Sequence, residues 1–300
     1  MASNVSTTMK KYQARLEKRL PEVFPKKLSE DRTVVASLYS LLAGGKRIRP
    51  VLMYMFADML SIDLDVIDDF AVAIEMIHTY SLIHDDLPCM DDDTLRRGKP
   101  TCHVANGESF ALLAGDALLN RAYEIIFGAV KKHSYTVNAA WFLADCAGIN
   151  GMIGGQSIDL DSEGKKIDTN KLCELHEKKT GALINAACQI PYLIYAAQSG
   201  EDKKLYNLIK SFSEGTGLGF QIKDDLLDVQ ADESVLGKSI GKDQRDEKST
   251  FVTVFGESNA QKMLDDTYND VFRALDGLKT MGYDVQDLRL LSQLLQNRIQ

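Results

Sequence analysis

Apolar residues recur every three or four positions over long stretches of the chain, as in Phe70, Ile74 and Ile77. This spacing marks one face of an α-helix, whereas the alternation that indicates a half-buried strand is scarce. After Pro100 the only further proline is Pro191, so long helices meet few breakers. The pattern predicts an all-α protein, a bundle of roughly ten or more mostly antiparallel helices.

Breaks in this pattern separate the expected helices. They fall at residues 21–25, 44–50, 91–107, 161–169, 199–202 and 232–249. No fixed-period repeat and no change in composition divides the chain. We therefore expect one domain over residues 1–300, long enough to bury a large core.

Composition and charge narrow the class of protein. Apolar residues make up 45% of the chain and charged residues 26%, as in ordinary globular proteins. The net charge of −8 would repel a polyanion, so we expect no nucleic-acid partner. Five cysteines form no CxxC pair, and no apolar run has signal-peptide or membrane-spanning length. We expect no membrane span and a cytoplasmic location.

A first acidic cluster follows an apolar stretch that ends at Ile83. It contains Asp85, Asp86 and Asp91, with Pro88 between the two groups. Six residues of unbroken helix turn through about 600°, so Asp85 and Asp91 would face different directions if the helix continued. We therefore expect the chain around Pro88 to bulge out of the helix and to return Asp91 to the side of Asp85.

A second acidic cluster places Asp224 and Asp228 one turn apart on a helical face, next to Asp225. Like charges at about 4 Å repel by roughly 4 kcal/mol at an effective dielectric near 20. Protonation, neighbouring cations or a divalent ion could offset this repulsion, and carboxylate oxygens are ligands that Mg²⁺ favours. Either cluster alone also fits a solvated run of charge at a helix end, but two clusters with apolar flanks favour a metal.

Basic residues stand near both clusters. Gly44 and Gly45 allow close approach of the backbone, and Lys46 and Arg49 follow them with an ammonium and a guanidinium suited to phosphate. The other candidates are His78, Arg96, Arg97, Lys179, Thr180, Lys238 and Lys248. Taken singly, each also fits a solvated charge or a packed histidine.

In combination and order, these segments resemble trans-prenyl diphosphate synthases, especially the bacterial farnesyl diphosphate synthases. The matching segments are residues 44–50, 81–98, 154–156, 179–181 and 219–228. The resemblance implies a helical bundle around a central cavity, of the isoprenoid synthase type. It also implies a homodimeric enzyme that condenses an allylic diphosphate, dimethylallyl or geranyl diphosphate, head-to-tail with isopentenyl diphosphate, giving farnesyl diphosphate and pyrophosphate.

The resemblance further implies roles for individual residues, with about three Mg²⁺ ions per site and Mn²⁺ as a substitute. The implied metal ligands are Asp85, Asp86 and Asp91 for two ions, and Asp224, Asp225 and Asp228 for the third. The implied ligands of the allylic diphosphate are Arg96, Lys179, Thr180, Gln221, Lys223, Lys238 and Lys248. The implied ligands of isopentenyl diphosphate are Lys46, Arg49, His78 and Arg97. Catalysis would fall to Asp85, Asp86, Asp91, Arg96, Lys179, Asp224 and Lys238.

The resemblance also implies that residues just before the first cluster set the length of the product. Tyr80 lies five positions before Asp85, about 7.5 Å along a helix, with Ser81 beside it. By this resemblance, an aromatic side chain here forms the floor of the elongation cavity, which means that it blocks growth of the product beyond fifteen carbons. An ordinary core tyrosine is the alternative.

Other functions remain open from the sequence. A geranylgeranyl diphosphate synthase of the same family would carry the same motifs. A class I terpene cyclase needs only one diphosphate, which would leave Lys46, Arg49 and Arg97 without a task. A non-catalytic partner subunit could lose one acidic cluster, whereas this chain keeps both.

Overall fold

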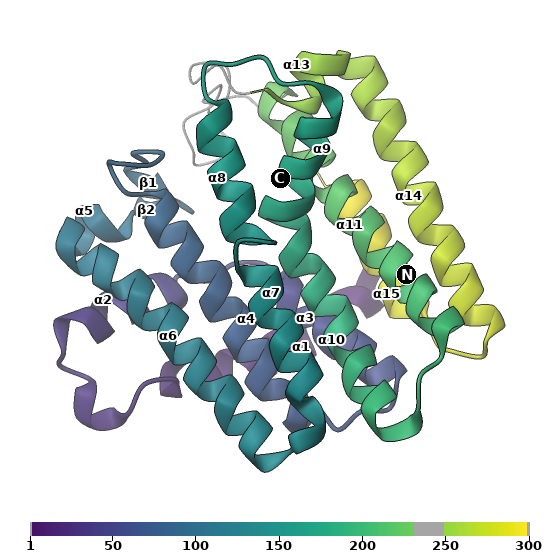
Figure 1. The fold of residues 1–300 in the computed structure, drawn as a ribbon, viewed down its shortest axis with the longest axis horizontal. Helices are drawn as coiled ribbons and strands as arrows, with labels where there is room; N and C mark the ends of the chain where they lie inside the picture. Colours follow the sequence, from purple (N-terminus) through teal and green to yellow (C-terminus); the bar gives the residue numbers. More distant parts are fainter. Residues whose placement is uncertain (1, 231–248, 299–300) are drawn as a thin grey trace.

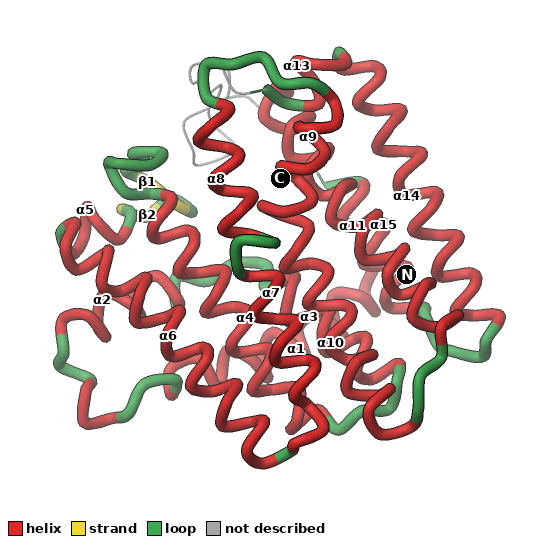
Figure 2. The backbone as a smooth tube through the Cα atoms, viewed as in Figure 1, coloured by secondary structure: helices red, strands yellow, loops and turns green. Residues whose placement is uncertain are grey.

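The computed structural model describes residues 2–230 and 249–298, and it forms a bundle of helices (Figures 1 and 2). The predicted all-α class is confirmed, since the described strands are confined to one short hairpin. The strands are β1 (Leu95–Arg96) and β2 (Lys99–Pro100). The helices are α1 (Ala2–Arg19), η1 (Leu20–Glu22), η2 (Lys26–Leu28), α2 (Arg32–Leu41), α3 (Ile48–Met59), α4 (Leu64–Asp85), α5 (Cys102–Asn106), α6 (Glu108–Lys132), η3 (Ser134–Thr136), α7 (Val137–Ala147), α8 (Met152–Ser162), α9 (Thr169–His176), η4 (Glu177–Gly181), α10 (Ala182–Ser199), α11 (Lys203–Gln230), α13 (Phe251–Phe255), α14 (Glu257–Thr280) and α15 (Gln286–Gln296).

The core sits where the long helices pack side by side. α3 lies against α4 and α10, α4 packs on α6, and α11 packs between α10 and α14. Every residue of α3 from Pro50 to Ala57 is buried, which is typical of a helix surrounded by others. One cluster of buried apolar residues runs from Met9 on α1 to Leu295 on α15.

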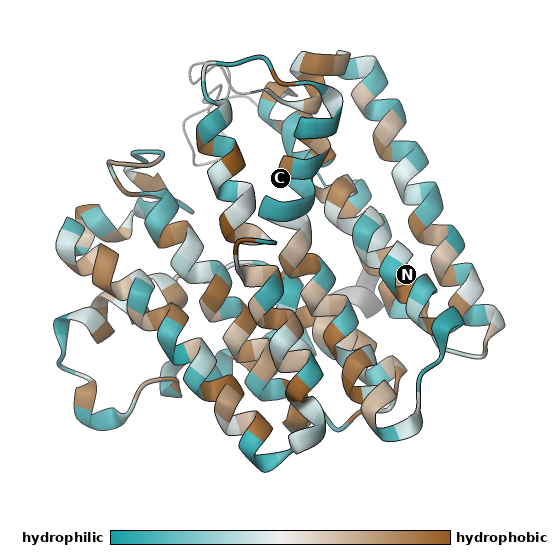
Figure 3. Ribbon diagram, in the orientation of Figure 1, coloured by the Kyte–Doolittle hydropathy of each residue, from teal (hydrophilic) through white to brown (hydrophobic). Residues whose placement is uncertain are grey.

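The outer helices are amphipathic, as the sequence pattern predicts. α14 buries residues spaced three and four apart, including Leu264, Tyr268 and Val271, and exposes polar residues between them. Figure 3 shows this as hydrophilic and hydrophobic bands along α14. None of the described helices combines the length and the apolar character needed to cross a bilayer.

A buried carboxylate ties the N-terminal helix to the core. The Asp68 side chain on α4 is fully buried and accepts hydrogen bonds from Arg15 Nε of α1 at 2.7 Å and from the Tyr54 hydroxyl of α3 at 2.6 Å. Arg19 pairs with the same carboxylate. Asp68 itself has no contact with water and depends on these donors for compensation, whereas the side chains of Arg15 and Arg19 remain 32% and 41% exposed.

We expect Asp68→Asn to lower the free energy of unfolding by about 2–3 kcal/mol, because the buried amide cannot accept all the hydrogen bonds that the carboxylate accepts from Arg15, Arg19 and Tyr54. The matched control is Asp69→Asn, whose carboxylate meets the largely exposed Lys132 at 3.4 Å. That change should alter stability by less than about 1 kcal/mol. The measurement is denaturant unfolding of both variants. Equal losses of unfolding free energy would show that Asp68 is no more important to stability than a surface carboxylate.

Candidate active site

The first acidic cluster lies where α4 ends. The helix stops at Asp85, and the chain then makes a turn in which the Asp91 N–H donates to the Asp85 carbonyl oxygen at 2.9 Å. The helix is interrupted before Pro88, as expected, and Asp91 returns toward Asp85, but no helix resumes directly after the turn. Pro88 has no N–H and disfavours helical geometry at Leu87, so the chain leaves the helix here instead of resuming it.

The hairpin after this turn aims Arg96 at the first cluster. Arg97 and Gly98 have positive φ angles of 55° and 73° and form the two-residue loop between β1 and β2, a geometry that matches the twist of a hairpin. Arg96 Nε lies 2.8 and 2.9 Å from the two carboxylate oxygens of Asp86, and its Nη2 lies 2.5 Å from Oδ1. Asp93 lies 3.8 Å from the same guanidinium. Arg96 thus fixes the buried Asp86 as well as adding positive charge beside it.

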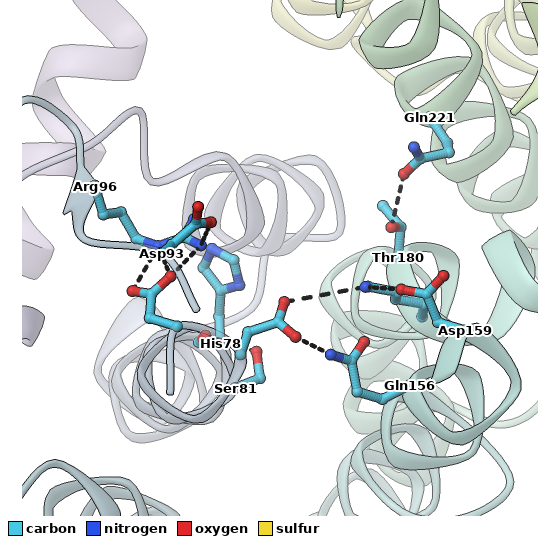
Figure 4. A network of polar contacts seen from close by, with 11 residues as sticks. His78, Ser81, Asp93, Arg96, Gln156, Asp159, Thr180 and Gln221 are labelled. Atoms are coloured by element: carbon cyan, nitrogen blue, oxygen red, sulfur yellow. Dashed lines mark hydrogen bonds and ion pairs between the residues drawn. The ribbon is translucent and has the colours of Figure 1, made fainter. Parts of the chain in front are cut away.

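A π-helical turn, η4, faces the end of α4. Such turns are rare and are frequent at functional sites. Lys179 on this turn places its Nζ 2.5 Å from Asp159 Oδ2 of α8 and 4.0 Å from Asp85 Oδ2 of α4. Gln156, one turn before Asp159, donates its amide to Asp85 Oδ1 (Figure 4). Three separate elements therefore meet at the carboxylate of Asp85.

The same turn continues the contacts to the second acidic cluster. The Thr180 hydroxyl lies 3.0 Å from Gln221 Oε1 of α11, as Figure 4 shows. Gln221 Nε2 donates to Asp225 Oδ1 at 2.8 Å, and the Phe251 N–H donates to the other oxygen at 2.7 Å. Asp225 is buried by these contacts, whereas the Asp224 side chain remains 45% exposed. Polar contacts thus run from α4 through η4 to α11 and join the two clusters.

The C-terminal segment reaches the second cluster. Arg298 Nη2 lies 2.7 Å from Asp224 Oδ1 and 2.7 Å from the carbonyl oxygen of Phe220. Its guanidinium carbon stands 3.9 Å from the centre of the Phe220 ring, and the side chain is only 8% exposed. The sequence prediction did not include Arg298, because 74 positions separate it from Asp224 and no motif marks it.

One basic residue of the glycine-rich segment is structural. Arg47 directly precedes α3 and has a φ of 50°, and its side chain is buried. Its guanidinium lies 2.7 Å from Glu75 Oε1, 2.7 Å from Glu17 Oε1 and 2.7 Å from the carbonyl oxygen of Leu41. These contacts anchor the segment that carries Lys46.

The remaining basic residues form a second positively charged group. Arg49 Nε is buried without a hydrogen-bond partner in the described part of the chain. Burial, reinforced by Arg49 and Arg97, holds the pKa of His78 well below its usual value, so its ring is neutral at neutral pH. Burial also lowers the pKa of Lys46. Arg97 donates to the Gly44 carbonyl oxygen. A cluster of cations with an unsatisfied buried donor fits an anionic ligand.

The other predicted residues lie near these groups. The Ser81 hydroxyl donates to the His78 carbonyl oxygen at 2.9 Å. Tyr80 is 5% exposed, and its buried hydroxyl has no hydrogen-bond partner in the described residues. Burial, with Arg298 nearby, lowers the pKa of Lys223. Asp228 lies one turn after Asp224 on α11. Lys238 and Lys248 lie outside the described residues.

Comparison with known proteins decides the family. Residues 31–281 match the family model described as polyprenyl synthetase. The chain belongs to the polyprenyl synthetase family. The resemblance seen in the sequence is thereby confirmed, and with it the expected class of enzyme, a prenyltransferase.

Three relatives illustrate the range of this family. The farnesyl diphosphate synthase of Escherichia coli (strain K12) is 41% identical over 263 residues, which cover 87% of each chain. The geranylgeranyl diphosphate synthase of Cyanophora paradoxa is 44% identical over 230 residues, 76% of this chain and 75% of its own. The crystal structure of a geranyltransferase from Helicobacter pylori, complexed with magnesium and isoprenyl diphosphate, has a TM-score of 0.82 at 33% identity and covers 97% of both chains.

The close packing of α8 on η4 generates a prediction. A Cβ atom at Gly155 would lie 2.1 Å from the backbone nitrogen of Lys179, so Gly155→Ala must displace this turn. Because a shift of about 1 Å can cost about 100-fold in rate, we expect prenyl transfer to fall by about that factor. The control is Gly128→Ala, where a Cβ meets nothing within 4 Å. Steady-state turnover and thermal melting are the measurements; unchanged turnover in Gly155→Ala would contradict this role.

Proposed function

We propose that this polyprenyl synthetase joins dimethylallyl or geranyl diphosphate head-to-tail to isopentenyl diphosphate, and that it releases farnesyl diphosphate and pyrophosphate. One observation carries the proposal: a chain of polar contacts joins two acidic clusters, and a separate group of cations lies beside them. This arrangement offers places for two diphosphates, as a condensation requires. The farnesyl diphosphate synthase of E. coli is a relative that supports this product.

The acidic clusters are suited to Mg²⁺. No three carboxylate, imidazole or thiol side chains of the described residues converge to hold an ion by themselves. This fits Mg²⁺, which usually binds through one or two carboxylates and completes its shell with water and substrate phosphates. We assign two ions to the first cluster, Asp85, Asp86 and Asp91. We assign a third ion to Asp224, supported by Asp225 and Asp228. Mn²⁺ could replace Mg²⁺ at these positions. When bound, such ions supply a Lewis acid for the departing pyrophosphate.

Residues of the chain itself prepare the allylic diphosphate to leave. Lys179 places an ammonium beside Asp85, where negative charge builds on the departing group. Thr180 and Gln221 hold the turn that carries Lys179 against α11. Arg96 adds positive charge while it fixes Asp86. Lys223, Lys238 and Lys248 stay expected ligands from the sequence. The alkene of isopentenyl diphosphate then attacks the allylic cation and forms the new C–C bond. The tertiary cation that results loses a proton from the adjacent carbon to the released pyrophosphate, which restores a double bond, so no nucleophilic side chain is needed.

The group of cations that contains Arg49 is assigned to isopentenyl diphosphate. Arg49 and Arg97 are its charged members, and the neutral His78 lies beside them. Lys46 is added from the sequence prediction. The unsatisfied Nε of Arg49 would gain a partner when a diphosphate binds, which removes the desolvation penalty of a buried donor. This second anion site is what separates the proposal from a class I terpene cyclase.

We also propose that the 300 residues act as one synthase unit and assemble as a homodimer. Large apolar side chains are exposed on α6, on α7 and just after it: Leu113 at 48%, Trp141 at 67% and Ile149 at 68%. Exposed apolar surface of this kind fits a protein interface. A cytoplasmic location remains an expectation from the sequence.

A substitution at Arg49 tests the condensation. We expect Arg49→Lys to raise the KM for isopentenyl diphosphate by about 10- to 100-fold, because an ammonium lacks the planar fork of a guanidinium. The KM for the allylic diphosphate should stay unchanged. Arg273→Lys, on the exposed surface of α14, is the matched control.

The assay supplies labelled isopentenyl diphosphate with five-, ten- or fifteen-carbon allylic partners, with and without a chelator. Loss of product with chelator is expected. Pyrophosphate release from the allylic substrate alone, at the same rate, would instead identify a cyclase. Failure to bind Mg²⁺ together with a diphosphate would favour a non-catalytic subunit.

Product length is tested at Tyr80, which we assign to the floor of the elongation cavity. Removal of the buried ring in Tyr80→Ala should open space below the growing chain and shift products beyond fifteen carbons. Tyr80→Phe keeps the ring and deletes a hydroxyl that has no hydrogen-bond partner in the described residues, so it should keep the wild-type product. Chromatography of dephosphorylated products in excess isopentenyl diphosphate gives the lengths. Identical lengths for Tyr80→Ala and wild type would refute the floor.

A further inference from the structure

Asp159 on α8 lies outside the residues predicted from the sequence, yet it makes a close contact in the site. We infer that Asp159 is a positioning residue, which holds the ammonium of Lys179 where the allylic diphosphate departs. This inference rests on the proposed function, in which Lys179 meets that diphosphate.

The geometry places Lys179 between two carboxylates from different helices. Its Nζ lies 2.5 Å from Asp159 Oδ2 and 4.0 Å from Asp85 Oδ2. The three side chains are 25%, 15% and 14% exposed, in the order Lys179, Asp159 and Asp85, so solvent screens their attraction only in part. The shorter contact is the one to Asp159, which therefore sets the position of the ammonium.

Side chains of α8 contact both Lys179 and the neighbouring carboxylate of Asp85. Gln156 donates to Asp85 from one side, and Asp159, three residues later on the same face, accepts from Lys179 (Figure 4). Gly155 lets α8 approach the Lys179 backbone closely enough for this contact, because any Cβ there would collide with it. One helical turn thus fixes the backbone of Lys179, its ammonium and the neighbouring Asp85.

Among the described residues, Lys179 is a cation in direct contact with Asp159. His176 is buried nearby, and burial lowers its pKa to about 4, so its ring is neutral at neutral pH. Asp159 is therefore not the counter-charge of a histidinium. Gln156 and Thr180 on the adjoining elements are neutral groups.

Positioning matters because lysine has a long flexible stem. An ammonium that is already oriented when negative charge develops on the leaving group stabilises the transition state without reorganising first. Asp85 cannot supply this anchor alone, since it is assigned to metal binding and a bound cation there would repel the ammonium. Asp159 provides a counter-charge on a separate helix.

The test compares Asp159→Asn with Asp161→Asn, an exposed position on the same helix. For Asp159→Asn we expect kcat/KM for the allylic diphosphate to fall by about 10- to 100-fold, with the KM for isopentenyl diphosphate unchanged. Asp159→Glu, which keeps the charge, should recover part of the loss. Lys179→Ala should erase the effect, so that the double variant Asp159→Asn/Lys179→Ala equals Lys179→Ala alone.

Binding measurements separate this inference from the proposed function. Calorimetry with inorganic pyrophosphate and Mg²⁺ should show weaker binding by about tenfold for Asp159→Asn and wild-type binding for Asp161→Asn, whether or not the protein turns over. Failure of wild type and Asp161→Asn to join the two substrates would refute the proposed function, while pyrophosphate affinity would still decide the role of Asp159.

Three outcomes would overturn the inference. Independent, multiplicative effects of the two substitutions would show that Asp159 does not act through Lys179. Loss of Mn²⁺ binding without diphosphate in Asp159→Asn would make Asp159 a metal ligand. A lower melting temperature with equal losses for both substrates would show a structural role only.

Discussion

The site depends on electrostatic compensation between carboxylates and cations that come from different helices. Two acidic clusters stand in one helical bundle, and repulsion within each would oppose folding without nearby positive charge. Lys179 meets Asp85, Arg96 meets Asp86, and Arg298 meets Asp224. Each of these cations could also bind a diphosphate. These ion pairs stabilise the protein without ligand, and binding of a diphosphate would rearrange them.

Irregular points of the backbone carry this chemistry, while regular helices hold it in place. α4 ends at Asp85, the first aspartate of the first acidic cluster, a tight hairpin loop follows, and η4 interrupts the run from α9 to α10. The left-handed conformation of Arg47 starts α3. At such points helical hydrogen bonds give way to other geometry, so side chains from several elements can point at one another. The buried pair of Arg47 and Glu75, with Glu17 at its more exposed edge, shows that polar contacts also support the site without joining it.

The two groups of cations also explain the choice among functions. An allylic diphosphate alone would need the acidic clusters and Lys179. The cations around Arg49, with an unsatisfied buried donor, have a task only when a second anion binds. Condensation of two diphosphates accounts for the cations beside the acidic clusters and for those around Arg49. The family model matches residues 31–281, a range that contains both groups of cations.

The sequence by itself determined the helical class, from apolar spacing, and the two acidic clusters with their basic neighbours, because these signals are local. It indicated the interruption near Pro88 but not that the helix ends at Asp85, since local geometry does not say whether a helix resumes beyond a proline. Only the tertiary structure brought Arg298 to Asp224 and Asp159 to Lys179, and turned Arg47 away from the site. Those contacts join residues far apart in the chain, and they arise from helix packing, which no single segment encodes.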